Sequence, residues 1–304
     1  MSVVVCKLPK AGLGNQLFPL MHALVFAKLN RLPVIVTGYH SIKLGPWIRR
    51  EKRKRNYHGY FTFEKSRIGE WRDRIQVKRL RKTNETVVEP EVARLPDTEL
   101  QHKLFLFSET GDYHDYFRKL KPHRQEAIDL FYSVIQPSVI DELHERETPV
   151  IGVHIRMGDF RPLQEGETYQ SGHVRPPQSL FVELINQIRK INGKDLAVSV
   201  FTDGYRSELG EIFRLKNTSI VETKSDLVDL LLLSKSSLII PTHGSTFSTW
   251  AVFLSESIVV LPFSYKNSLR PGFFNEKIYE GEFQDENDKM VQNIKSIGEK
   301  SFTN

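Results

Sequence analysis

The strongest constraint on the fold of this chain is a regular alternation of short β-branched segments and helical segments between residues 150 and 262. The candidate strands cover residues 150–155, 196–202, 219–221, 237–241 and 258–262, and the candidate helices cover residues 178–191, 208–215, 226–234 and 248–254. Successive strands that are joined by helices run parallel, and helices then cover both faces of the sheet. The second half of the chain is therefore predicted to have an α/β fold built on a parallel sheet.

The first half opens with a shorter version of the same pattern. An apolar strand at residues 2–8 leads through glycines 12 and 14 into a helix at 15–30 and a second strand at 33–37. From residue 39 to residue 96 the chain becomes polar and basic, with aromatic residues between the charges. This composition favours an irregular, ligand-facing insertion over a packed core.

Two domains are expected from 304 residues. We predict an N-terminal lobe at residues 1–148 that contains the insertion 39–96, and a C-terminal lobe at residues 149–304. A helical pattern near residues 288–297 in the tail is predicted to pack back on the N-terminal lobe.

Polar clusters follow three of the strands predicted for the second half. They are His154 to Asp159, Thr202 to Gly204, and Thr242 to Ser248. In open parallel sheets, ligands bind outside the carboxyl ends of the strands. The three loops are therefore expected to converge on one site.

His154 and Arg156 lie on the same side of the chain, because side chains alternate along a strand. The guanidinium of Arg156 offers a planar fork that matches phosphate oxygens. The alternative is structural: Arg156 and Asp159 close the turn as an ion pair, and His154 is a satisfied core residue. The presence of three polar loops at neighbouring strand ends favours the ligand.

The loop from Thr242 to Ser248 places hydroxyl groups directly before a helix. Ser245, Thr246 and Ser248 could donate hydrogen bonds to a diphosphate, or one of them could simply cap the helix. Asp203 could accept a hydrogen bond from a base or a ribose, or it too could cap a helix.

The segment Gly12-Leu13-Gly14-Asn15-Gln16 lies between a strand and a helix, where glycines allow close approach of a phosphate. It lacks the third glycine of a dinucleotide fingerprint and the lysine of a P-loop, which disfavours NAD or ATP binding by those routes. A tight structural turn is the alternative.

The formal charge of +6 is concentrated in one region. Residues 49–82 hold 14 Lys and Arg against four Asp and Glu, a local charge of +10, so that the rest of the chain sums to −4. A solvated surface, nucleic acid, anionic lipid and a charged acceptor are all open as explanations. No apolar run reaches the roughly 20 residues of a membrane span, and we expect a cytoplasmic protein. The single cysteine, Cys6, lies in an apolar run and is expected to be a packed thiol.

Taken together, these motifs resemble the alpha-1,2-fucosyltransferase family. The resemblance is carried by Gly12 to Gln16, by Gly152 to Asp159, by Phe201-Thr202-Asp203 and by Asp229 through Trp250, and it covers most of the chain. It implies a GT-B architecture, with two Rossmann-like lobes, parallel sheets and a cleft between the lobes. It also implies metal-independent transfer of L-fucose from GDP-fucose with inversion at the anomeric carbon.

The resemblance also implies roles for individual residues. Arg156 would hold the β-phosphate, and His154 and Asp203 would read the guanine. Ser245, Thr246 and Ser248 would line the diphosphate. Gly14, Asn15 and Gln16, from the other lobe, would close over the donor.

Three positions depart from the family pattern. Met157 stands where a second arginine is usual, Ala11 replaces a glycine, and Thr249 occupies a position that is often aromatic. The expected acceptor is a glycan or a lipid-linked oligosaccharide, with α-1,2 transfer to galactose in bacterial surface polysaccharide synthesis. The basic region, residues 49–82, would then face either the acceptor or the inner surface of an anionic membrane.

The catalytic base stays open among Asp159, Glu165 and Glu167, with Asp159 ranked first. Two rivals remain. One is a GT-B enzyme that uses another nucleotide sugar, and the other is a nucleic-acid-binding protein that uses residues 49–82. Because the rest of the chain is net acidic, we expect no nucleic-acid partner.

Overall fold

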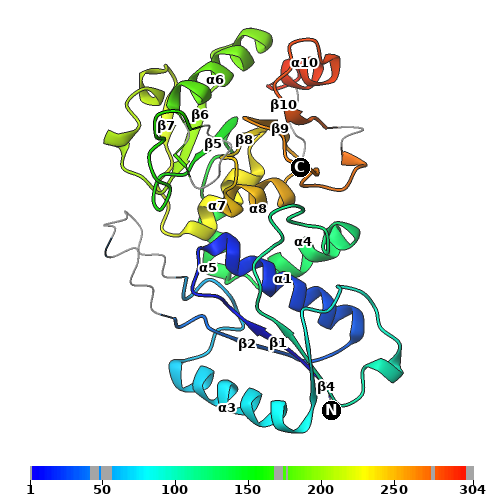
Figure 1. Ribbon diagram of the computed structural model, residues 1–304. Helices are drawn as coiled ribbons and strands as arrows, with labels where there is room; N and C mark the ends of the chain where they lie inside the picture. Colours follow the sequence, from blue (N-terminus) through cyan, green and yellow to red (C-terminus); the bar gives the residue numbers. More distant parts are fainter. Residues whose placement is uncertain are drawn as a thin grey trace. The chain divides into compact units, whose positions relative to one another are not determined.

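A computed structural model describes residues 2–41, 48, 57–167, 174–175, 177–274 and 278–298 (Figure 1). The basic run at residues 49–55 lies outside the described residues. The chain divides into two compact units, residues 1–43 with 55–140 and residues 44–54 with 141–304. Each unit is built on its own parallel sheet, so the predicted α/β fold class is confirmed. No helix within the described part of the chain has both the length and the apolar character needed to cross a membrane.

The sheet of the first unit has the strand order β2-β1-β4-β3, and every neighbouring pair is parallel. Its strands are β1 (Val3–Lys7), β2 (Val34–Thr37), β3 (Glu85–Val88) and β4 (Lys103–Phe107). The first three elements, β1, α1 and β2, form the β-α-β unit that the sequence predicts.

Two helices cover opposite faces of this sheet. Helix α1 (Leu13–Asn30) places Phe26 against Phe105 and Phe107 of β4, with ring centroids 4.8 and 5.5 Å apart. Helix α3 (Arg67–Thr83) packs Val77 on the other face, in a cluster that contains Val3 and Leu104. The remaining helical segments of this half are η1 (Asp97–Glu99), η2 (Lys121–His123), α4 (Arg124–Ser133) and α5 (Pro137–His144).

The region 39–96 is more regular than the sequence suggests, because it contains α3 and the edge strand β3. Its helix begins at Ser66, whose hydroxyl oxygen accepts a hydrogen bond from the backbone N–H of Gly69 at 3.2 Å. Few apolar side chains are needed here, since only one face of α3 meets the sheet and arginine and lysine are good helix formers. The high charge of the segment therefore reflects an exposed helix face, where we had expected irregular chain.

The sheet of the second unit has the strand order β10-β9-β8-β5-β6-β7, again with all pairs parallel. Its strands are β5 (Ile151–Ile155), β6 (Val198–Thr202), β7 (Thr218–Ile220), β8 (Leu238–Ile240), β9 (Ile258–Leu261) and β10 (Glu280–Glu282). Strand order runs outward from β5 to β7 and then resumes with β8 on the other side of β5. The contact between β5 and β8 is thus the point at which strand order reverses, where open α/β sheets bind ligands.

Helices again cover both faces. The helices of this unit are α6 (Gln178–Asn192), α7 (Asp226–Lys235), α8 (Thr246–Leu254) and α10 (Asp288–Lys295). Phe181 and Ile185 of α6 join Val153 and Val200 in one apolar core. On the other face, Gly152 of β5 lies directly against α7 and the residue that follows it, Ser236.

One predicted helix of this half is replaced by tighter turns. Residues 208–215 were expected to be helical, but the structure has two short 3₁₀ turns there, η4 (Arg206–Glu208) and η5 (Ile212–Arg214). Gly210 lies between the two turns, and glycine is a poor residue for a helix interior.

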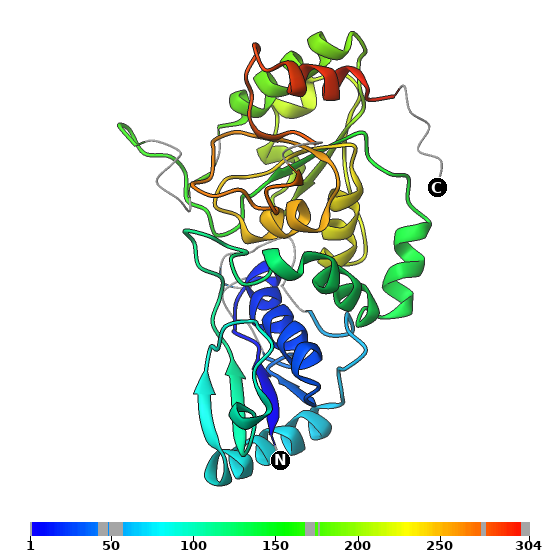
Figure 2. The same cartoon turned by 90° about the vertical axis from the view of Figure 1, so that its right-hand side faces the viewer.

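The tail helix α10 lies beside α6 in the second unit (Figure 2). Its apolar residues Met290 and Ile294 are fully buried in the core of that unit. The side-chain amide of Asn192 at the end of α6 donates to the backbone oxygen of Ile294 at 2.8 Å. We had expected this helix to pack on the N-terminal lobe, whereas its apolar face is occupied within its own unit.

Candidate functional site

Arg156 follows the last residue of the central strand β5 and is held by two carboxylates. Its Nη1 lies 2.6 Å from Oδ2 of Asp203, and its Nη2 lies 2.7 Å from Oδ1 of Asp159. The side chain is 17% exposed, so the fork is largely buried but reaches the surface. The structural ion pair that the sequence offered as an alternative is therefore present, and it includes a second carboxylate.

Asp203 fixes the turn in which Arg156 lies. Its Oδ1 accepts hydrogen bonds from the backbone N–H groups of Met157 at 2.8 Å and Gly158 at 3.1 Å. Burial by itself would raise the pKa of Asp203, but Arg156 and these two N–H groups together lower the pKa below its ordinary value. Asp203 stays ionised, and both of its oxygens contact the loop that follows β5.

Thr242, directly after β8, joins that loop to the neighbouring strand. Its hydroxyl donates to the backbone oxygen of His154 at 2.6 Å and accepts from the backbone N–H of Arg156 at 3.0 Å. Thr242 is completely buried. Three loops that the sequence predicted to converge are thus linked by direct contacts: those after β5, β6 and β8.

His154 is buried beneath this site as a neutral side chain. Its ring stacks on Phe247 with centroids 5.0 Å apart, and the exposed fraction of the residue is 3%. Burial lowers the pKa of His154 to about 3, so the ring carries no charge near neutral pH. Within the described residues, Nδ1 of His154 has no hydrogen-bond partner. The reading of His154 as a satisfied core histidine therefore does not hold for this nitrogen.

The three hydroxyl residues at the start of α8 differ in how they are used. Ser248 donates inside the loop, to the backbone oxygens of Thr242 at 3.1 Å and Ser245 at 3.3 Å. Ser245 is the N-cap residue of α8, but its side chain makes no capping hydrogen bond. No carboxylate lies in the first turn, so the partial positive charge of the helix end is not offset there by an acidic residue. Ser245 and Thr246 thus fit the predicted diphosphate site better than Ser248.

Two features of the α8 loop had no clear signal in the sequence. Tyr265 lies after β9, and its phenolic oxygen accepts from the backbone N–H of Gly244 at 3.2 Å. Its ring stacks on His243 with centroids 4.7 Å apart. Because Tyr265 is 21 residues from Gly244, only the tertiary structure shows that it supports the loop.

The remaining carboxylates considered as bases differ in their surroundings. Glu167 is held by both terminal nitrogens of Arg161, at 2.5 and 2.6 Å, and this pairing lowers its pKa. Glu165 is exposed. Asp159 has a side chain that is 38% exposed and lies beside Arg156, so it is the base candidate that shares the site.

Gly14, Asn15 and Gln16 lie in the first unit, in the first turn of α1. The side-chain amide of Gln16 donates to the backbone oxygen of Pro9 at 2.8 Å and so closes the loop after β1. Oδ1 of Asn15 is buried and has no hydrogen-bond partner within the described residues. Asn15 is thus the residue of this segment with hydrogen-bonding capacity left for a ligand, and its contact with the donor stays a prediction.

Met157, at the position where the resemblance leads one to expect a second arginine, packs as an apolar side chain. It is 6% exposed and belongs to the apolar core of the second unit. A Cβ atom at Gly204 would lie 2.7 Å from its Cγ, so the side chain fills the space between the two loops. The next guanidinium is that of Arg175, whose Nε donates to the backbone oxygen of Met157 at 3.2 Å and whose Nη1 pairs with Glu208 at 3.3 Å.

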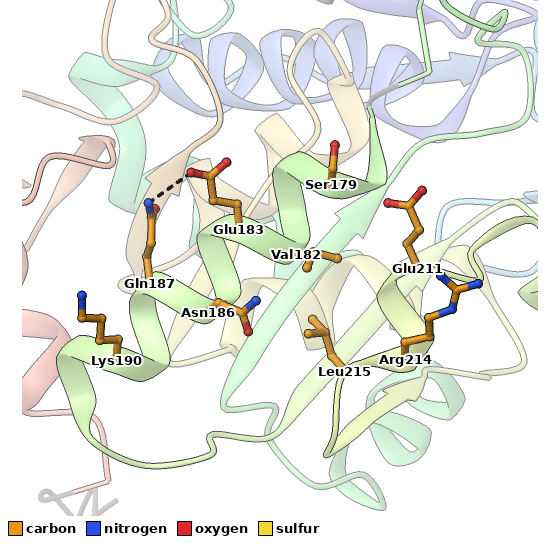
Figure 3. A pocket seen from close by; sticks show the side chains of 9 residues that line it. All are labelled: Ser179, Val182, Glu183, Asn186, Gln187, Lys190, Glu211, Arg214 and Leu215. Atoms are coloured by element: carbon orange, nitrogen blue, oxygen red, sulfur yellow. Dashed lines mark hydrogen bonds between the residues drawn. The ribbon is translucent and has the colours of Figure 1, made fainter.

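The second unit also has a shallow groove of about 750 Å³ on the outer side of α6 (Figure 3). Its lining comes from α6 and from η5 with its flanking residues Glu211 and Leu215, and Gln187 donates to Glu183 across one helical turn at 3.4 Å. None of the predicted site residues lines this groove. Within the described residues, no group of three or more His, Cys, Asp and Glu is placed to hold a metal ion.

Comparison of the sequence with known protein families and with curated proteins gave no match. Comparison of the fold with solved structures found NodZ alpha-1,6-fucosyltransferase soaked with GDP-fucose, at a TM-score of 0.50 and 13% identity over 90% of this chain and 97% of that chain. A fucosyltransferase NodZ from Bradyrhizobium aligns with a TM-score of 0.49 and 13% identity, over 84% of this chain and 94% of that one. POFUT1 in complex with GDP aligns with a TM-score of 0.44 and 15% identity, also over 84% and 94%. The first similarity shows that this chain has the GT-B type of α/β fold.

Proposed function

We propose that this protein is an inverting glycosyltransferase that transfers L-fucose from GDP-fucose to a hydroxyl group of a glycan. The observation that carries the proposal is the position of Arg156, at the carboxyl end of the central strand and at the point where strand order reverses. The fold similarity to a fucosyltransferase soaked with GDP-fucose supports the same donor.

The donor would bind in the second unit. Its diphosphate would lie between Arg156 and the N-terminus of α8, where Ser245 and Thr246 offer hydroxyl groups. Near neutral pH His154 is uncharged, so it would contact the donor through hydrogen bonds of its ring. The positive charge next to the diphosphate would come from Arg156. Both oxygens of Asp203 already contact the loop after β5, one through Arg156 and one through backbone N–H groups. We therefore assign Asp203 the role of positioning Arg156, in preference to the predicted contact with guanine.

The chemistry follows from this placement. An acceptor hydroxyl attacks the anomeric carbon of fucose, the bond from that carbon to the β-phosphate oxygen breaks, and GDP leaves with the electron pair. Arg156 and the N-terminus of α8 stabilise the negative charge that develops on the diphosphate. Asp159 would take the proton from the acceptor, after the phosphate has replaced it as a partner of Arg156.

For the acceptor we propose a galactose in a bacterial surface polysaccharide, with an α-1,2 linkage, either free or on a lipid carrier. This reaction would take place in the cytoplasm or at the inner face of the membrane. The linkage rests on the sequence resemblance, and structure determination of the product by NMR would test it.

A donor panel tests the proposed function. The purified protein is incubated with GDP-fucose, GDP-mannose, UDP-glucose and UDP-galactose, and released GDP or UDP is measured with and without galactoside acceptors. We expect GDP release from GDP-fucose that rises when an acceptor is added. Release of UDP from UDP-sugars, with no release of GDP from GDP-fucose, would instead indicate a GT-B enzyme that uses another class of donor. Salt-sensitive binding of RNA or DNA with no release from any donor would favour the nucleic-acid rival.

A further inference from the structure

The first unit contains a cavity of about 810 Å³ at the carboxyl ends of its strands. Its walls are the residues that end β1 and β2, Ser108 after β4, and one face of α3. This volume lies within the range that small-molecule sites occupy in proteins, roughly 300–1,000 Å³. None of the residues placed at the donor site above lines it.

The described residues that line the cavity carry positive charge only. They include five cationic side chains and no carboxylate: Lys7, Lys10, Arg74, Lys78 and Arg81. Arg74 is paired with Glu70, at 2.8 Å from Nε to Oε1. Within the described residues, the other four cations have no carboxylate partner. Among the described residues, these four positive charges therefore face the cavity without an ion-pair partner.

Helix α3 presents these groups along a single stripe. Trp71, Arg74, Lys78 and Arg81 recur every three or four residues, which places them on one face of the helix. Trp71 is 62% exposed although it lines the cavity. Hydroxyl groups are supplied from the other walls by Thr37, Ser41 and Ser108.

The rim of the cavity is fixed by close backbone contacts. Gly38 has φ +102°, and a Cβ atom there would lie 2.6 Å from the backbone oxygen of Leu8, so only glycine fits. The buried carboxylate of Glu70 accepts from the backbone N–H groups of Gly38 at 2.7 Å and His40 at 3.1 Å. This carboxylate thus ties α3 to the end of β2 and fixes Arg74 at the rim.

We propose that this cavity binds an anionic saccharide, a sugar that carries carboxylate, sulfate or phosphate groups. The cations recognise the acid groups, the indole of Trp71 stacks on the C–H face of a sugar ring, and the hydroxyl groups bind its polar edge. If the proposed function holds, this ligand is the acceptor, and the acceptor is an acidic glycan.

The composition of the cavity favours a saccharide over a nucleotide and a membrane. Among the described lining residues there is no Asp, Glu, Asn or Gln, so the side chains that pair with the edges of adenine and cytosine are missing there. A membrane surface would be met by a convex basic face, whereas these cations line a hollow. Arg72, Arg79 and Lys82 of the same helix lie outside the cavity and provide an internal comparison.

The test is calorimetric titration of the full-length protein without any donor. The probes are a trigalacturonate, a heparin-derived tetrasaccharide and neutral maltotetraose, with inorganic phosphate as a competitor. We expect the acidic probes to bind and to quench tryptophan fluorescence, and maltotetraose to bind at least about tenfold more weakly. A response to the carboxylate probe, the sulfate probe or phosphate identifies which acid group is recognised.

Two charge-matched double variants locate the site. Lys78→Ala with Arg81→Ala should weaken binding of the acidic probes at least about tenfold, because two charge-assisted contacts are lost. Arg79→Ala with Lys82→Ala removes the same charge from the same two turns of α3 and should change binding less than about threefold. Trp71→Ala should abolish the fluorescence change and weaken the binding of every saccharide probe. Thermal melting of each variant shows that its fold is intact.

Three results would overturn the proposal: equal losses in both double variants, equal binding of acidic and neutral probes, or displacement of the acidic probes by GDP. Binding to phosphatidylglycerol vesicles that is lost in both double variants, with no saccharide binding, would assign α3 to a membrane. Because no donor is used, the saccharide result stands even if GDP-fucose is not turned over. Conversely, fucose transfer that is unaffected by Lys78→Ala with Arg81→Ala leaves the enzyme function standing without this site.

Discussion

Arg156 is the residue on which the candidate site depends, and its partners change what a substitution should do. A loop arginine at a strand end contributes little to core packing, but it can still stabilise a fold through its ion pairs. The structure pairs it with Asp203 and Asp159, and Asp203 is largely buried. Removing the guanidinium would take from Oδ2 of Asp203 its ion pair with Arg156, while Oδ1 would keep its two backbone N–H donors. A loss of stability and a loss of turnover must therefore be separated.

We predict that Arg156→Lys and Arg156→Ala both lower turnover of GDP-fucose by about 100-fold or more, comparable to removing a transition-state hydrogen-bond donor in other enzymes. Lysine keeps the charge but loses the planar fork. Arg156→Ala should also destabilise the fold by about 1–3 kcal/mol, the cost of a buried polar group that has lost its partner. Turnover, GDP titration and thermal melting of the purified variants measure the three effects.

A double variant separates the two effects. Arg156→Ala combined with Asp203→Asn removes both charges, so its melting temperature should recover toward that of the wild type while turnover stays low. Arg189→Lys serves as a control, since Arg189 pairs with Asp195 at 2.8 Å in the same unit and has no place in the site. Near-normal turnover of either Arg156 variant would mean that the ion pairs are purely structural.

Single residues show where sequence reasoning succeeds and where it stops. His154, Arg156 and Asp203 could be named because each ends or follows a predicted strand, and parallel strands bring their carboxyl ends together. Their pairing could not be predicted, because Arg156 and Asp203 come from different strands and their contact depends on register. Tyr265 had no local signal, since it reaches the Gly244 loop through tertiary contacts from 21 residues further along the chain.

At the scale of elements, the packing of α7 on β5 depends on a glycine. A Cβ atom at Gly152 would lie 2.2 Å from Oγ of Ser236 and 2.9 Å from Cδ1 of Leu233. We therefore predict that Gly152→Ala destabilises the second unit by about 1–3 kcal/mol, the usual cost of overpacking a core. Thermal melting measures this loss.

Gly210→Ala provides the comparison, because a Cβ atom there meets nothing within 4 Å. Its free energy of unfolding should lie within about 0.5 kcal/mol of the wild-type value, as is usual for surface substitutions. If Gly152→Ala melts like the wild type, α7 is less closely packed on β5 than the structure has it.

The elements themselves were predictable where hydrophobic periodicity was strong. Buried strands such as β5 and β8 are short β-branched runs, which indicate a parallel sheet directly. Helix α3 was missed because its mean composition is polar and only one narrow face is apolar. The edge strands β3 and β10 were missed because neither is a buried apolar run, and their pairing partners define them.

For the whole molecule, the proposed reaction should not require a divalent cation. The sequence has no Asp-x-Asp triad of the kind that could hold a metal ion against a diphosphate. We predict that turnover of GDP-fucose persists in EDTA and rises less than about twofold with added Mg²⁺ or Mn²⁺, since Arg156 and the N-terminus of α8 would stabilise the leaving group. Initial rates of GDP release in metal-free buffer check this. Strict dependence on Mn²⁺ would contradict both the mechanism and the assignment of Arg156.

The hydrogen bonds of Thr242 also bear on the order in which the second unit folds. The hydroxyl of Thr242 bonds to residues 86 and 88 positions earlier in the chain, whereas β5, β6 and β7 pair as consecutive strands. Closing such a long loop lowers the conformational entropy of the chain, and this cost precedes any stabilisation by the contact itself. The ribosome releases β5 and β6 well before β8, and the loop after β5 gains its last supports only when β8 docks beside β5. Donor binding would thus be acquired late in folding, and an incomplete nascent chain would have no binding competence.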